Sequence, residues 1–159
     1  MSVAAERRGW LASALLTFAL YLVSHSLATP VSAAVASDLV VESARVVQSL
    51  PGSDTTVLYL TLRNDGARAD RLVAASTPAA SMVHLHAGQL KGGVNNMRSV
   101  TGFDVPAHGR LQLSVGGDHL MLMGLTGQLK PGSRVKLTLM FEHAADLEVD
   151  VPVVELTGN

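Results

Sequence analysis

The sequence contains no cysteine among its 159 residues. This absence excludes disulfide bonds, zinc sites built on thiolates and a lipid attached to an N-terminal cysteine. It also excludes a blue-copper electron-transfer centre, which needs a cysteine thiolate beside two histidines. A chain without thiols suits an oxidising compartment, where thioethers can bind soft metal ions in place of thiolates.

Aromatic residues and unbalanced charge are also scarce. Phe, Trp and Tyr make up 4% of the chain, and the formal net charge is −1. No basic or acidic block occurs, so the composition gives no support to a nucleic-acid-binding surface. No Ser-His-Asp arrangement, paired carboxylate motif or phosphate-binding loop stands out, and the chain is therefore not expected to be an enzyme.

The first 36 residues have the pattern of a secretory signal peptide. Arg7 and Arg8 precede an apolar run over residues 11–23, and small residues continue to Ala36. A basic start, a short apolar segment and an A-x-A site predict cleavage after Ala36, with Ala33 as the second choice. An uncleaved membrane anchor is the alternative, because no Asp, Glu, Lys or Arg occurs between residues 9 and 37.

Residues 37–159 are predicted to form one all-β domain. Segments rich in Val, Leu and Thr recur at intervals of about 8–12 residues with turn residues between them, which is typical of a sandwich of about eight or nine strands. The predicted strands are Leu39–Val47, Thr55–Arg63, Arg71–Ala75, Met82–His86, Phe103–Val105, Arg110–Val115, His119–Leu125, Arg134–Phe141 and Leu147–Val154. The Gly- and Asn-rich segment that ends at Met97 is predicted to be a loop.

Histidine and methionine alternate with apolar residues in two short segments. These are Met82–His86 (MVHLH) and His119–Met123 (HLMLM). As strands, both would place Val and Leu on one face and His and Met on the other. Imidazoles and thioethers are neutral, soft ligands that favour Cu(I) over Cu(II) and zinc, so the second face is predicted to bind copper.

Four residues of this region follow a specific spacing. Ten residues separate His86 from Met97, twenty-one separate Met97 from His119, and one separates His119 from Met121. This spacing resembles that of the periplasmic copper chaperones called PCu(A)C. The run Gly116–Leu125 (GGDHLMLMGL) and the segment Asn95–Val100 (NNMRSV) are similar to that family as well.

The resemblance implies a cupredoxin-like, Greek-key β-sandwich that binds Cu(I) through His86, Met97, His119 and Met121. It places the site at one end of the sandwich, where two strand ends and a loop meet. It further implies a periplasmic chaperone that supplies the copper centre of cytochrome c oxidase, together with a Sco-type thiol protein. The protein is separately predicted to be a monomer. A copper-buffering or resistance protein without a client is one alternative. A β-sandwich interaction module with these residues in its core is another.

The sequence departs from the family pattern on either side of the first histidine. Ala87 stands where the family often has a further methionine, and His84 stands where it commonly has a glutamate. For His84 three roles are open: a hydrogen-bonding support, an accessory ligand that would favour Cu(II), or a solvated side chain. Asp118 either orients the imidazole of His119 or stabilises the turn before it.

The remaining methionines have a simpler interpretation. A methionine on a β-strand usually fills irregular space in a core. Met82, Met123 and Met140 are therefore predicted to pack rather than to bind metal.

Overall fold

The computed structural model describes residues 38–91 and 94–155 of the chain. The predicted signal peptide, residues 1–36, lies outside this part. Within the described residues no helix is long and apolar enough to cross a membrane.

The described residues form ten β-strands, one more than the sequence predicted. Their bounds are β1 (Leu39–Val47), β2 (Thr55–Asn64), β3 (Asp70–Ser76), β4 (Ala80–Lys91), β5 (Val94–Ser99), β6 (Phe103–Val105), β7 (Arg110–Leu113), β8 (His119–Leu125), β9 (Arg134–Phe141) and β10 (Leu147–Val154). Eight of the nine predicted strands agree with these bounds to within two residues. The exception is the fourth, because β4 continues five residues beyond His86 and then pairs with the additional strand β5.

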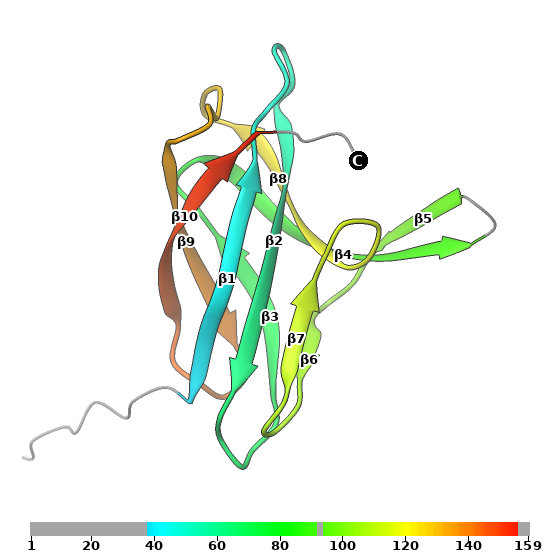
Figure 1. Ribbon diagram of the computed structural model, residues 1–159, viewed down its shortest axis with the longest axis vertical. Coiled ribbons are helices and arrows are strands. Elements are labelled where there is room, and N and C mark those ends of the chain that lie inside the picture. Colours follow the sequence, from blue (N-terminus) through cyan, green and yellow to red (C-terminus); the bar gives the residue numbers. More distant parts are fainter. Residues whose placement is uncertain (1–37, 92–93, 156–159) are drawn as a thin grey trace, which may run out of the picture. The chain divides into compact units, whose positions relative to one another are not determined.

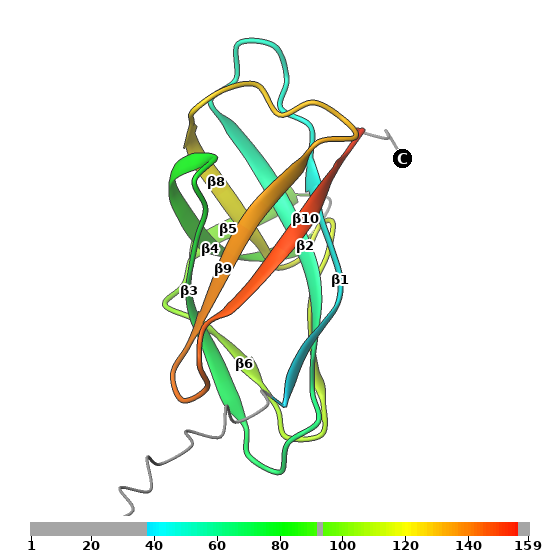
Figure 2. The same cartoon turned by 90° about the vertical axis from the view of Figure 1, so that its left-hand side faces the viewer.

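The strands build two sheets that are joined at one edge. One sheet has the order β5-β4-β8-β2-β1, and the other has the order β10-β9-β3-β6. A short parallel pairing of β1 with β10, at Val46↔Val153 and Val47↔Val154, joins them. Figure 1 shows the first sheet, and Figure 2 shows β9 and β10 in front of it as the second layer. The all-β, cupredoxin-like sandwich expected from the sequence is confirmed.

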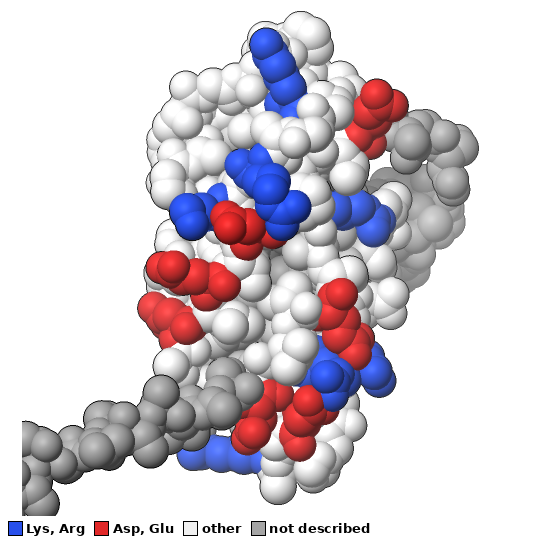
Figure 3. Space-filling model, turned by 60° about the vertical axis from the view of Figure 1, so that its left-hand side comes forward, with Lys and Arg blue, Asp and Glu red and all other residues white. Residues whose placement is uncertain are grey.

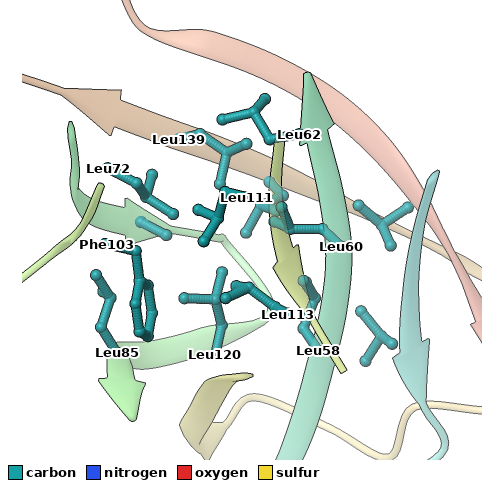
Figure 4. Packing of buried hydrophobic residues seen from close by; sticks show 14 of the residues in the cluster. Leu58, Leu60, Leu62, Leu72, Leu85, Phe103, Leu111, Leu113, Leu120 and Leu139 are labelled. Carbon is teal, nitrogen blue, oxygen red and sulfur yellow. The ribbon is translucent and has the colours of Figure 1, made fainter. Parts of the chain in front are cut away.

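Alternate residues of the strands fill the space between the sheets. In β2 every second side chain is buried, including Leu58, Leu60 and Leu62. Figure 4 shows these leucines meeting Leu72 from β3 and Leu139 from β9, on the opposite sheet. Each fully buried leucine contributes about 1.5–3 kcal/mol to folding through removal of its apolar surface from water. The two-residue period of burial therefore fixes which side chains point outward, including those of the candidate site.

One edge of β2 is shared by two strands. β8 pairs with residues 55–58 of β2, and β7 pairs with residues 60–63 of the same edge. Between Leu113 and Leu120 the chain leaves the edge in a loop opposite Tyr59. Backbone hydrogen bonds close this loop, with Ser114 N–H donating to the Asp118 carbonyl (2.8 Å) and Gly117 N–H donating to the Ser114 carbonyl (3.1 Å). The loop delivers the chain into β8 at His119.

An ion-pair network holds β7 against its neighbours at the other end of the sheet. The carboxylate of Glu42 accepts hydrogen bonds from Arg110 Nε (2.8 Å) and Arg110 Nη2 (2.9 Å), and it pairs with Arg63 Nε at 2.8 Å. The hydrogen bonds from Arg110 are the main cause that lowers the pKa of Glu42. Elsewhere, Figure 3 shows acidic and basic side chains interspersed on one face of the molecule.

Candidate metal centre

Strand pairing brings the two histidine- and methionine-containing segments together. β4 and β8 are antiparallel neighbours, with His86 directly opposite His119 and His84 directly opposite Met121. Residues directly opposite each other in an antiparallel pair project from the same face of the sheet. Leu120, between the two site residues of β8, is fully buried on the other face. The face predicted to bind metal is therefore continuous across both strands.

Met97 belongs to the same face but not to a loop. It lies in β5, directly opposite Gly88 of β4, and Gly88 is two residues from His86. The prediction of a loop was wrong because the local Gly- and Asn-rich composition disfavours strands, whereas pairing with β4 supplies hydrogen bonds that this composition does not reveal. Figure 1 shows the β4–β5 hairpin projecting from the body of the sandwich. The Met97 side chain is 57% exposed, so it is not part of the core.

His119 is held in one orientation by its own loop. Its side chain is only 5% exposed, and its Nδ1 lies 3.0 Å from the carbonyl oxygen of Gly117. When Nδ1–H donates to this carbonyl, Nε2 carries the free lone pair that a metal ion needs. The ring of Tyr59 stands edge-on to the imidazole, with 6.5 Å between the ring centroids.

The side-chain hydrogen bond of Asp118 matches neither of the two roles considered for it, which were orienting the imidazole of His119 and stabilising the turn. Its Oδ1 accepts a hydrogen bond from the backbone N–H of Gly88 at 3.1 Å. The imidazole of His119 instead faces the carbonyl of Gly117, one residue earlier. Asp118 thus ties the β7–β8 loop to the β4–β5 hairpin.

Gly88 is a site residue that the sequence interpretation missed. A Cβ at this position would lie 2.3 Å from the carbonyl oxygen of Gly117, a distance that real contacts essentially never show. The hairpin and the loop can therefore approach only because residue 88 has no side chain. The carbonyl that Gly88 approaches is the same one that faces Nδ1 of His119. The spacing of residues in the sequence does not predict this contact, because it joins strand β4 to a loop that lies far from it in the sequence.

The imidazole of His86 lies beside that of His119. Their ring centroids are 5.5 Å apart and their planes are nearly perpendicular, at 83°. Nδ1 of His86 is buried and has no hydrogen-bond partner within the described part of the chain. A buried nitrogen without a partner costs roughly 1–3 kcal/mol, so a ligand that satisfies it is favoured.

The predictions for the other methionines and for His84 can be compared with the structure. Met82 is 54% exposed, so the prediction that it packs in the core was wrong. Met123 and Met140 are half-buried. His84 is half-buried, with its ring centroid 6.1 Å from that of His86, and its three suggested roles all remain predictions.

The predicted place of the site needs one correction. His86, Met97 and Met121 lie within strands β4, β5 and β8, and only His119 stands at a strand end. The site therefore spans three adjacent strands of one sheet rather than the junction of two strand ends with a loop. The cause is the extension of β4 and β5 into a paired hairpin.

The donor set suits a soft ion. Within the described residues, no group of three or more His, Cys, Asp or Glu side chains could hold a metal ion. The imidazoles of His86 and His119 therefore need further donors, and Met97 and Met121 on the same face carry thioethers. Neutral imidazole and thioether ligands favour Cu(I) over harder or more highly charged ions.

Copper affinity is expected to depend on pH through His86. Burial, followed by the nearby rings of His119 and His84, lowers the pKa of His86 below its ordinary value of about 6.5. Because only the neutral ring binds metal, Cu(I) affinity should stay level from pH 7.5 to about 6.5 and decrease below that range. Competition titrations with a Cu(I) chelator at several pH values measure this. An affinity that stays level down to pH 5 would contradict histidine ligation.

Comparison with known families gives one match over most of the described domain. Residues 39–153 match the family described as LpqE-like, putative lipoprotein LpqE-like. A putative lipoprotein of Leifsonia xyli subsp. xyli (strain CTCB07), Lxx21020, is 36% identical over 108 residues, which cover 67% of this chain. The match spans 65% of that relative's length, just under two thirds.

Solved structures with the same fold include PCuAC domains. The copper-bound PCuAC domain from PmoF2 has a TM-score of 0.64 and 22% identity, with 74% of this chain and 93% of that chain covered. The Cu(I) form of DR1885 from Deinococcus radiodurans has a TM-score of 0.59 and 37% identity, with 70% and 75% covered. The first likeness concerns the fold alone, whereas the second extends to sequence.

Proposed function

The chain belongs to the LpqE-like family, and from this membership and the geometry of its site we propose that it is a Cu(I)-binding metallochaperone. The proposed ligands are His86, Met97, His119 and Met121. The observation that carries the proposal is the direct pairing of His86 with His119 on a face that also presents both thioethers. The 37% identical protein DR1885 has been solved in a Cu(I) form, which supports the same metal and oxidation state here.

The protein is proposed to act outside the cytoplasm. The family and the Leifsonia relative are both described as putative lipoproteins, which points to an exported, membrane-associated protein. The present sequence has no cysteine that could carry a lipid, so a secretory signal over residues 1–36 is the proposed route of export. We place the mature protein in the periplasm, as a monomer and without enzymatic activity.

The architecture of the site supports delivery as well as storage. Met97 is exposed and borders an open hollow of about 430 Å³ between the hairpin and Asp118. A partner can therefore reach a bound ion from the side of Met97 without unfolding of the sandwich. Thioethers carry no charge, so a thiolate of a partner can displace them and draw Cu(I) away.

The proposed client is the copper centre of cytochrome c oxidase. Because this chain contains no thiol, it cannot reduce an oxidised acceptor, and a Sco-type thiol protein is the proposed partner for that step. Copper-loaded protein should therefore transfer Cu(I) to the reduced, metal-free copper domain of the oxidase and not to its disulfide form. Separation of the two proteins followed by metal analysis measures the transfer.

Two results would contradict delivery. Retention of copper by this protein in both mixtures would favour a copper-buffering or resistance protein that uses the same residues. If an unrelated protein with two reduced cysteines received as much Cu(I) as the oxidase domain, the transfer would not be directed at that domain.

A further inference from the structure

Further soft donors continue along the face of the proposed copper site. β4 and β8 place three pairs in successive rows on this face: His86 with His119, His84 with Met121, and Met82 with Met123. The proposed ligands account for the first row, for Met121 and for Met97 on β5. Three side chains of these rows are therefore not ligands of the proposed site: the thioethers of Met82 and Met123 and the imidazole of His84.

We propose that Met82, Met123 and His84 form a second, weaker Cu(I) site beside the first. This proposal rests on the copper binding proposed above and extends it to residues that the family spacing does not include. It concerns binding of an additional ion and involves no change of oxidation state.

The distances of strand geometry permit such a site. Directly opposite residues have Cβ atoms about 4.5–5.5 Å apart, and residues two apart on one strand are about 6.5–7 Å apart. Methionine has three rotatable side-chain bonds, so the two sulfur atoms can turn toward a common ion. His84 stands between this pair and His86, with its ring 6.1 Å from that of His86, and can therefore supply the nitrogen.

Exposure makes a packing role for Met82 less favourable. Met82 is 54% exposed, although an apolar side chain gains stability by leaving water. Because Met82 is exposed, a cation can reach it from solvent.

The neighbouring residues are electrically compatible with a cation. On the β2 side, Thr55 lies opposite Met123 and Val57 lies opposite Met121. The two rows are thus Thr55–Met123–Met82 and Val57–Met121–His84, and none of these six side chains carries a fixed charge. Cu(I) at this place would meet soft donors without a lysine or arginine in either row to repel it.

Methyl NMR of the full chain with labelled methionines tests the proposal during an anaerobic Cu(I) titration. The first equivalent should shift the methyl signals of Met97 and Met121, and a second equivalent should shift those of Met82 and Met123. The double variant Met82→Leu with Met123→Leu should bind the first equivalent of Cu(I) but not the second. Leucine is close to methionine in volume, so the strands are expected to remain folded.

Met140→Leu is the matched control, because Met140 is a half-buried strand methionine of the other sheet. This variant should bind both equivalents of Cu(I) as the wild-type chain does. Saturation of the wild-type chain by one equivalent, with the Met82 and Met123 signals unmoved, would overturn the second site while leaving the first intact. Failure to bind any Cu(I) would overturn the proposed function as well.

Discussion

Replacing both proposed thioether ligands, Met97→Ala with Met121→Ala, is expected to weaken Cu(I) binding by more than about a hundredfold. Residues that merely support metal ligands typically change affinity by about 10–100-fold, and loss of two ligands should exceed that. The remaining imidazoles of His86 and His119 would then bind the ion with two donors. Titration against a Cu(I) chelator of known affinity measures the change.

Folding should hardly be affected by this double replacement. Met97 is 57% exposed and Met121 is half-buried, so neither belongs to the cluster that fills the sandwich. Met140→Ala provides a methionine control away from the site and should leave the affinity unchanged. Thioether ligation would be contradicted if the Cu(I) affinity of the double variant stayed within about twofold of wild type. Such a change lies far below the 10–100-fold range for residues that support metal ligands.

The second large effect is expected at Gly88, which binds no metal. Gly88→Ala should weaken Cu(I) binding by about 10–100-fold, the range found for groups that orient metal ligands. An added Cβ would stand 2.3 Å from the carbonyl of Gly117 and force the loop away from the hairpin. The loop carries the carbonyl that faces Nδ1 of His119, and the hairpin carries Met97, so both ligands would be displaced.

Gly127→Ala is the matched control for this substitution. A Cβ at Gly127 would meet no atom within 4 Å, and copper affinity should remain that of wild type. Asp118→Ala tests the same contact without adding atoms, because it removes the acceptor of the Gly88 N–H, whereas Asp118→Asn retains an acceptor oxygen. Wild-type affinity in both Gly88→Ala and Asp118→Ala would show that the contact does not position the site.

The regular part of the fold could be predicted from the sequence because burial repeats every second residue. In β2 and β9, leucines and other apolar residues alternate with outward-facing ones, and the predicted bounds agree with the structure. The same period placed His119 and Met121 on the outward face of β8. Local sequence was sufficient here because each strand repeats one simple pattern over seven or more residues.

The hairpin and its contacts could not be predicted in this way. Glycine and asparagine between His86 and Met97 predict a loop locally, and only pairing with β4 makes a strand of β5. The contact of Gly88 with Gly117 joins strand β4 to the β7–β8 loop, about thirty residues further along the chain, which no periodicity records. Likewise, a strand methionine such as Met82 is usually buried, whereas here its side chain is 54% exposed.

X-ray absorption of the protein loaded with one equivalent of Cu(I) tests the central claim most directly. A site made of His86, Met97, His119 and Met121 predicts a first shell of mixed nitrogen and sulfur scatterers, two of each. The sulfur contribution should disappear when the Met97→Ala, Met121→Ala variant also carries Met82→Leu and Met123→Leu, because the thioethers of both proposed sites are then absent. A shell of nitrogen and oxygen alone in the wild-type protein would contradict the proposed site.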